Sequence, residues 1–129
     1  MNTIKISFLA LTLGLMSFAT VSAITWKSET IDVGEIPQGK PKAIIFEFKN
    51  TGKTDVIITN VQGSCGCTAT EYTKEAIKAG KSGVVTATYN AANVGVFTKT
   101  VTVTTNADAN PKVLTLKGIV KTAWLRVNY

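Results

Sequence analysis

Residues 97–105, FTKTVTVTT, give the clearest indication of the fold. On an extended chain Val101 and Val103 fall on one side and the threonines between them fall on the other. Successive side chains of a β-strand point to opposite faces, so one face of this stretch would be buried and the other would meet water. This alternation is typical of an antiparallel sheet with one solvated face. It predicts a β-strand from Phe97 to Thr105.

Six further stretches are rich in β-branched and aromatic residues and are separated by turn-forming residues. They run from Ser28 to Gly34, Lys42 to Lys49, Asp55 to Val61, Thr68 to Thr73, Ser82 to Tyr89 and Lys112 to Val120. The apolar run Val56-Ile57-Ile58 suits a central strand. Seven strands in about 100 residues predict an all-β fold, an immunoglobulin-like antiparallel β-sandwich.

The connections between these strands carry their own expectations. Asn50 to Lys53 predicts a tight, hairpin-type connection. Thr73 to Ala79 is compatible with one helical turn. Asp32 and Asp55 are expected at strand ends or turns, where an aspartate commonly bonds the local backbone. Trp26, near the start of the expected domain, is expected to pack in the core or at its rim.

The first 23 residues have the pattern of a secretory signal peptide. Lys5 precedes an apolar core from Ile6 to Met16, and small residues follow as far as Val21-Ser22-Ala23. An uncleaved anchor is the alternative, but a spanning helix needs about 20 mostly apolar residues. We expect cleavage after Ala23, which would leave 106 residues and no membrane span. Residues 24–129 would then form a single immunoglobulin-like domain with a C-terminal tail, 121–129, containing Trp124.

Composition excludes several kinds of site. The chain has no histidine, and both methionines, Met1 and Met16, lie in the expected signal peptide. This excludes Ser-His-Asp catalysis, histidine zinc sites and blue-copper sites. Glu71 and Glu75, four residues apart, are expected to be solvated side chains rather than a hydrolytic pair. The net charge is +6, but the lysines are scattered, so nucleic acid is not an expected partner.

Cys65 and Cys67 are the only cysteines and flank Gly66. An exported protein meets an oxidising compartment, so an internal disulfide is one candidate state. Alternate residues of an extended strand lie about 6.6–6.8 Å apart, near the upper limit of about 6.8 Å for a disulfide, although Gly66 lets the backbone bend closer. Such a short bridge would stabilise the fold by at most about 1.6 kcal/mol. Strain would make it labile.

Two other states of the pair stay open. Free thiols would pack as small hydrophobic groups. Two thiolates would suit Cu(I), whereas Zn²⁺ normally takes four ligands. We therefore treat Cys65 and Cys67 as a candidate disulfide or thiol pair, and we expect no catalytic residue, metal or cofactor.

Short motifs in a fixed order then resemble a known family. They are Asp32-Val33-Gly34, Phe46-Glu47-Phe48-Lys49-Asn50-Thr51-Gly52, Ser64-Cys65-Gly66-Cys67-Thr68, Ile77-Lys78-Ala79-Gly80, Tyr89-Asn90, Gly95-Val96-Phe97-Thr98-Lys99, Thr105-Asn106 and Leu114-Thr115-Leu116-Lys117-Gly118. From about Thr30 to Val120 the chain resembles a bacterial extracytoplasmic family of unknown function with a Cys-Gly-Cys-Thr signature. The resemblance implies an exported immunoglobulin-like domain similar to major sperm protein and pilus-chaperone domains. It implies no activity, and Val33, Ala79 and Asn90 depart from the family pattern.

These observations predict a non-enzymatic structural or protein-binding module of the bacterial cell envelope, periplasmic or secreted. Its partner would be an unidentified envelope protein or surface component, bound by loops or by an exposed sheet edge that accepts a strand. The alternative from another class is a thiol-redox or Cu(I)-handling protein that uses Cys65 and Cys67.

Overall fold

The computed structural model describes Gly14 and residues 23–122, so most of the expected signal peptide and residues 123–129 of the expected tail, with Trp124, lie outside the described residues. Within the described part there are eight β-strands and no helix. The strands are β1 (Ile24–Trp26), β2 (Thr30–Pro37), β3 (Lys42–Asn50), β4 (Ile58–Gly63), β5 (Thr68–Tyr72), β6 (Ser82–Tyr89), β7 (Gly95–Thr105) and β8 (Lys112–Lys121). The predicted all-β sandwich is confirmed.

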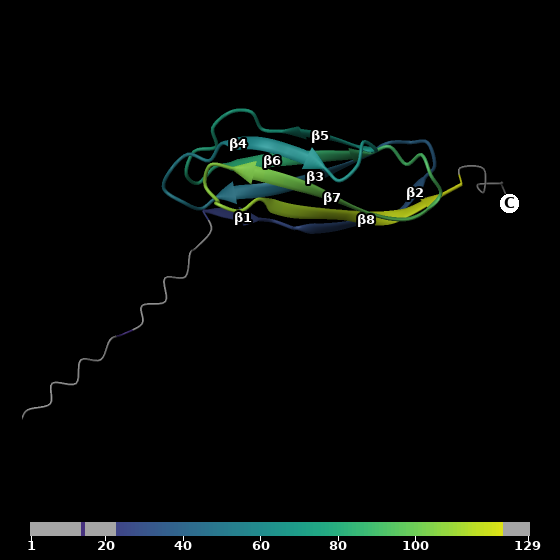
Figure 1. Ribbon diagram of the computed structural model, residues 1–129, viewed down its shortest axis with the longest axis horizontal. Helices are drawn as coiled ribbons and strands as arrows, with labels where there is room; N and C mark the ends of the chain where they lie inside the picture. Colours follow the sequence, from purple (N-terminus) through teal and green to yellow (C-terminus); the bar gives the residue numbers. More distant parts are fainter. Residues whose placement is uncertain (1–13, 15–22, 123–129) are drawn as a thin grey trace, which may run out of the picture.

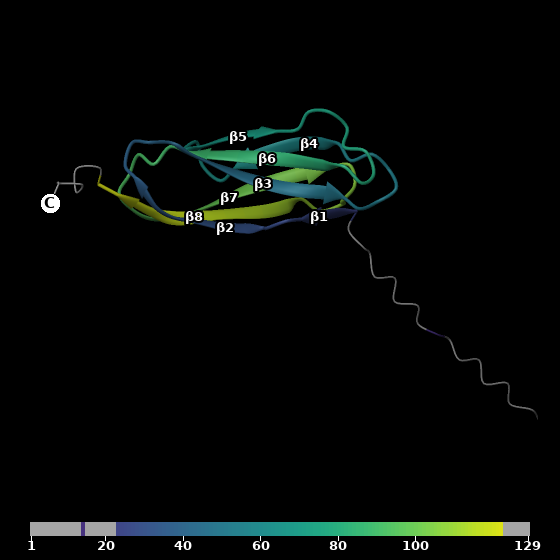
Figure 2. The ribbon, with the colours of Figure 1, turned by 180° about the vertical axis from the view of Figure 1, so that it is seen from behind.

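Two four-stranded sheets pack face to face. Sheet A has the strand order β1-β3-β6-β5, and sheet B has the order β2-β8-β7-β4. Figure 1 shows sheet B in front and Figure 2, from behind, shows sheet A in front. In both views β4 and β5 run along one long side of the sandwich, and β1 and β2 run along the other. Each sheet therefore contributes one edge strand to each side.

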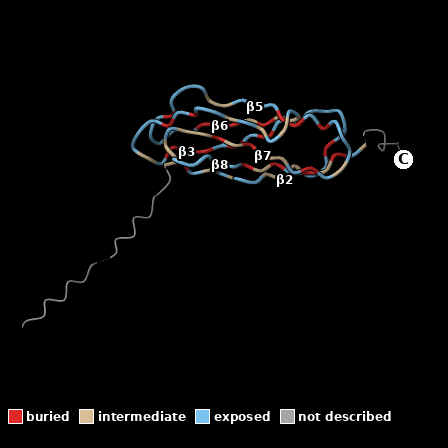
Figure 3. The backbone as a smooth tube through the Cα atoms, viewed as in Figure 1, coloured by how far each residue is buried: buried red, intermediate tan, exposed pale blue. Residues whose placement is uncertain are grey.

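The core lies between the sheets, where the alternating apolar residues meet. Phe46 and Phe48 of sheet A and Leu114 and Leu116 of sheet B are almost fully buried. Figure 3 shows buried and more exposed positions alternating along β3, β6, β7 and β8. Trp26 packs on Phe48, with ring centroids 4.9 Å apart, as expected for a residue at the rim of the core. Burying these side chains is the main favourable contribution to folding.

One strand pair differs from the expected antiparallel arrangement. β1 pairs with β3 antiparallel, but the chain then crosses to sheet B, where β2 pairs with β8 in parallel. β1 and β2 run in the same direction although they lie in different sheets. β2 is therefore parallel to β8, the last strand. The structure also adds β1, which the sequence analysis did not predict.

A bulge in β2 explains two glycines. The β2–β8 register shifts between Asp32 and Glu35, and Gly34 there has φ +69°. Asp32 Oδ1 accepts a 2.8 Å hydrogen bond from Gly34 N, so this aspartate bonds the local backbone as predicted. A Cβ on Gly118 of β8 would lie 2.7 Å from Val33 Cγ2 and 2.8 Å from Gly34 O, so only glycine fits beside the bulge.

The predicted central strand at Val56-Ile57-Ile58 is wrong. β4 begins at Ile58 and is an edge strand of sheet B, while Val56 makes only an isolated bridge to Ile77. Val56 and Ile58 are buried but Ile57 is exposed, so the run alternates instead of being covered on both faces.

The connection after β3 is not a hairpin, because β3 and β4 belong to different sheets. Asn50, fully buried at the end of β3, organises it. Its Nδ2 donates 2.8 Å hydrogen bonds to Thr54 O and Ile77 O, and its Oδ1 accepts one from Gly52 N. Residues 73–79 form no helical turn, since Ile77 bridges to Val56 instead.

Candidate functional site

Cys65 and Cys67 lie in a turn that carries the chain from β4 to β5, and hence from sheet B to sheet A. The two sulfur atoms are joined in a disulfide, and the Cα atoms are 5.3 Å apart. The spacing of about 6.6–6.8 Å expected from the sequence applies to an extended strand. The turn shortens it, so the pair lies well within the usual range for a disulfide of about 4.4–6.8 Å.

Hydrogen bonds hold both ends of the turn. Ser64 N donates to Thr100 O of β7 at 2.8 Å, and Asn90 N, just after β6, donates to Cys67 O at 3.0 Å. Within the turn Thr68 N donates to Cys65 O at 3.3 Å. The crossing is therefore tied to both sheets by backbone groups as well as by the sulfur atoms.

Thr68 lies beneath the disulfide. It is buried, and its Oγ1 is 3.9 Å from Cys65 Sγ and 4.0 Å from Cys67 Sγ. Both cysteines are half-buried, and Gly66 between them is exposed. The sulfur atoms thus have a hydroxyl group on the inner side and are not sealed from solvent. In the bridged state they present no thiolate to a metal ion, and the described residues hold no cluster of three or more His, Cys, Asp or Glu side chains.

A second feature lies on the opposite side of the sandwich, at the outer edge of β3. Asn50 N donates to Lys81 O and Asn50 O accepts from Gly80 N, so the backbone of Asn50 faces the β6 side. Backbone groups alternate in direction along a strand, so Ala43, Ile45 and Glu47 face the β1 side. Glu47 O does accept a hydrogen bond from Lys27 N, at 2.9 Å.

Beyond Glu47 this edge has no strand partner in the described chain. β1 pairs with β3 only from Phe48 to Asn50, because the chain then leaves for sheet B. The outward N–H and C=O groups of Ala43 and Ile45 are consequently left without a neighbouring strand. We call Ala43–Ile45 the open edge. Water is its partner unless another strand adds there.

Two of the other edge strands, β2 and β4, are modified in ways that discourage strand addition. β2 has a bulge, acidic side chains at Asp32 and Glu35, and Pro37 at its end. β4 has a bulge between Ile58 and Asn60. Bulges, charges and proline are the usual protections of an edge strand. The register of β3 with β6, in contrast, is continuous from Lys42 to Lys49.

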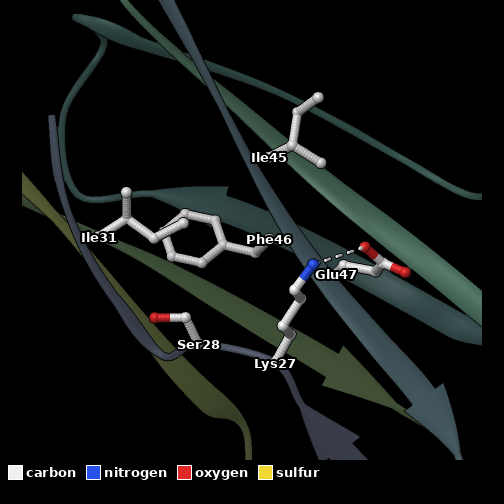
Figure 4. Close-up of a pocket in the computed structure, with 6 residues that line it drawn as sticks. All are labelled: Lys27, Ser28, Ile31, Ile45, Phe46 and Glu47. Carbon is white, nitrogen blue, oxygen red and sulfur yellow. Dashed lines mark ion pairs between the residues drawn. The ribbon is translucent and has the colours of Figure 1, made fainter.

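A pocket of about 520 Å³ adjoins the open edge (Figure 4). It lies where the chain crosses from β1 to β2, and it is lined by Lys27, Ser28, Ile31, Ile45, Phe46 and Glu47. Lys27 Nζ reaches Glu47 Oε2 at 3.9 Å, as the dashed line shows. An apolar side chain from a strand added along β3 would therefore find Ile31 and Phe46 beside it.

The comparison with family models decides the relationship. Residues 24–120 match the model described as Protein of unknown function (DUF1573). The chain belongs to the DUF1573 family. This confirms the predicted resemblance to a family of unknown function, and no curated protein matches the chain.

Solved structures similar to this DUF1573 chain share its fold at low identity. A protein of unknown function from Porphyromonas gingivalis W83 gives a TM-score of 0.65 at 16% identity, over 78% of this chain and 50% of that one. The ASH/PapD-like domain 7 of human CEP192 gives 0.64 at 13% identity, over 79% and 87%. The VesB protease of Vibrio cholerae gives 0.61 at 15% identity, over 78% and 32%. This chain thus spans half the length of the Porphyromonas protein, and the similarities show the fold alone.

Sequence reasoning located the cysteine pair of this DUF1573 chain but did not place the open edge. It considered an exposed sheet edge only in general. The sequence signal for this edge was Ile45, an apolar residue at a position where the alternation of the strand predicts a solvent-facing side chain. Ile45 is 60% exposed in the structure. Glu71 and Glu75 are exposed, as expected, and lie in β5 and in the loop after it. No helix among the described residues is long and apolar enough to cross a membrane.

Proposed function

We propose that this protein is an exported, non-enzymatic binding domain that takes up an extended segment of a partner protein along the open edge of β3. The observation that carries the proposal is the unpaired outward backbone of Ala43 and Ile45 beside the apolar pocket. Addition of a strand to an exposed edge is a common mode of peptide recognition, in which backbone hydrogen bonds supply affinity and side-chain pockets supply specificity.

The existing pairing indicates how the added strand runs. β1 is antiparallel to β3, and an added strand that continues the line of β1 would also be antiparallel. It would meet Ile45 first and Lys42 last, so its carboxyl end would lie near Lys42. Its side chains would alternate between the pocket and solvent. The partner segment therefore has apolar residues at alternate positions.

Charge adds a further requirement. Lys40 and Lys42 are exposed at the far end of the open edge, and neither forms an ion pair with any described residue. Lys27, at the other end, already has Glu47 as a partner. An acidic residue or terminal carboxylate at the carboxyl end of the added strand would complement Lys40 and Lys42. We therefore assign the partner as an extended protein segment that ends in acidic residues.

A fluorescent synthetic peptide that alternates valine with threonine and ends in two aspartates is the probe. We expect saturable binding by fluorescence anisotropy. Ile45→Pro removes the outward N–H without removing a β3–β6 hydrogen bond, since proline is tolerated where that group faces solvent. The variant should bind about tenfold more weakly, the equivalent of one backbone hydrogen bond.

Ile45→Ala is the matched control, because it keeps the backbone N–H and shortens only the exposed side chain. Because Ile45 also lines the pocket, this variant should bind more weakly than the unmodified protein but more tightly than Ile45→Pro, and the difference between the two variants isolates the N–H. Lys42→Glu should bind more weakly in low salt. Thermal unfolding of each variant separates loss of binding from loss of folding. Equal binding by Ile45→Pro and the unmodified protein would exclude the open edge. Self-association that Ile45→Pro abolishes, with no peptide binding, would make a second copy the occupant instead.

Export rests on the signal pattern of residues 1–23. The measurement is the intact mass of the protein isolated from the envelope fraction. A mass corresponding to residues 24–129 supports cleavage after Ala23, and a full-length mass contradicts it. Ala23 O accepts hydrogen bonds from Thr51 N at 2.9 Å and Gly52 N at 3.2 Å, so cleavage at this bond would leave both donors to solvent.

A further inference from the structure

We propose that the Cys65–Cys67 disulfide is a thiol–disulfide exchange site that accepts an electron pair from dithiols, with the Thr68 hydroxyl stabilising the thiolate that is released. The inference is independent of binding at the open edge. It rests on the place of the disulfide in the fold, its accessibility and the position of Thr68.

The fold has little need of this bond. The disulfide closes a loop of only three residues, so it removes little entropy from the unfolded chain. Ser64 is already bonded to Thr100 in sheet B, and Cys67 is already bonded to Asn90 beside sheet A. Breaking the sulfur–sulfur bond leaves these backbone bonds in place. The sulfur atoms would therefore stay close together after reduction, ready to form the bond again.

The site is open to a reactant. Both cysteines are half-buried and Gly66 is exposed, with no atom outside Cys65–Cys67 within 4 Å of the position its Cβ would take. A small thiol or a flexible dithiol peptide can approach over Gly66. Exposed disulfides are more readily reduced than buried ones and are the kind used in regulation or catalysis.

Thr68 is placed to assist either sulfur. Its Oγ1 lies at nearly equal distances from the two Sγ atoms, 3.9 Å and 4.0 Å. Hydrogen bonds to a charged acceptor are stronger than those to a neutral one. The hydroxyl would thus favour the state in which one sulfur carries a negative charge. Thr68 is a positioning residue that also stabilises charge, and the two cysteines are the reacting groups.

The exchange proceeds in two steps. A thiolate of the dithiol attacks one cysteine sulfur, forms a mixed disulfide and releases the other cysteine as a thiolate. The second thiol of the reactant, once deprotonated, attacks the reactant's other sulfur in the mixed disulfide. This releases the first cysteine as a thiolate. The reactant leaves as a disulfide, oxidised by two electrons, and the protein becomes a dithiol that carries those two electrons and two protons.

The test treats the oxidised full chain with dithiothreitol, stops the reaction with iodoacetamide and measures intact mass over time. We expect two labels to enter while far-UV circular dichroism and tryptophan fluorescence remain native. Thr68→Val should be reduced about tenfold more slowly, the effect of one hydrogen bond to a charged group. Thr68→Ser should retain the rate, because it keeps the hydroxyl. Thr70→Val, on the same strand, is the matched control, since Thr70 Oγ1 bonds to Val61 O and not to sulfur.

A second arm replaces dithiothreitol with a synthetic peptide that contains two cysteines. For each protein molecule that gains two labels, one peptide should lose two hydrogens. Entry of the labels only after urea unfolds the protein would overturn the proposal and identify the bond as structural. Equal rates for Thr68→Val, Thr68→Ser and the unmodified protein would remove Thr68 from the site. If Thr68→Val does not fold, the comparison of native and urea-treated unmodified protein still decides whether the disulfide exchanges.

Discussion

On the side of the sandwich formed by β4 and β5, the chain crosses between sheets through the Cys-Gly-Cys turn, and Thr70 Oγ1 donates to Val61 O to link the two edge strands. On the side formed by β1, β2 and β3, the chain also crosses between sheets, but β1 is only three residues long. The backbone of Ala43 and Ile45 is left without a strand partner there. We call the β4–β5 side, where the disulfide turn and the Thr70–Val61 bond hold the crossing, the closed side, and the β1–β2 side with Ala43–Ile45 the open side. Each gives a different candidate site.

The largest expected effect concerns the end of β3, where the chain leaves sheet A for sheet B. Asn50→Ala removes three hydrogen bonds, one of them fully buried and two partly buried, and leaves Thr54 O, Ile77 O and Gly52 N without the side chain. The free energy of unfolding in urea should fall by about 3 kcal/mol. Asn60→Ala, at an exposed position of β4 on the closed side, is the control and should change it by less than about 0.5 kcal/mol. Equal losses would mean that Asn50 does not organise the connection after β3.

Substitution of two glycines, one on each side of the sandwich, tests how tightly each side is packed. Gly118→Ala places a methyl group against Val33 and the Gly34 carbonyl, and pushes β2 away from β8 on the open side. We expect a loss of about 2 kcal/mol in urea denaturation, typical of overpacking. Gly66→Ala, in the turn on the closed side, meets nothing within 4 Å outside its neighbours Cys65 and Cys67 and should cost less than about 0.5 kcal/mol. A reversed order would contradict the packing described for β2.

Reduction of the disulfide tests how the closed side is held. Because the loop is so short, reduced protein should be less stable than oxidised protein by at most about 1.6 kcal/mol. Urea unfolding with and without dithiothreitol measures the difference, and a Cys65→Ser, Cys67→Ser double variant supplies the control. A much larger loss would show that the bond, rather than the backbone hydrogen bonds of Ser64 and Cys67, holds the crossing.

The smallest effect is expected at the mouth of the pocket. Lys27 and Glu47 form an exposed ion pair, and such pairs contribute little. Lys27→Ala should lower the free energy of unfolding by less than about 0.5 kcal/mol, as should Lys78→Ala, which breaks the comparable exposed pair with Asp55. A loss above about 1 kcal/mol for Lys27→Ala alone would assign the lysine stem a packing role over the pocket.

Several features could be predicted because they depend on neighbours along the chain. The alternation in residues 97–105 predicted β7 and its buried face, and Asp32 was expected to bond its own turn. Cys65 and Cys67 stood out as the only cysteines. In contrast, β1 could not be predicted, since three residues are too few to form a recognisable pattern. The sequence also predicted a central strand at Val56, because an apolar run does not reveal which residues meet the core.

The sequence by itself determined that the chain forms strands and which side chains the regularly alternating strands bury, because side-chain direction follows from the two-residue period of an extended backbone. Only the tertiary structure decided which strands are neighbours. The early change of sheet by β2 leaves Ala43–Ile45 open, and the turn between β4 and β5 brings the Cys65 and Cys67 Cα atoms to 5.3 Å. Both depend on hydrogen bonds between residues far apart in the sequence, which no local pattern specifies.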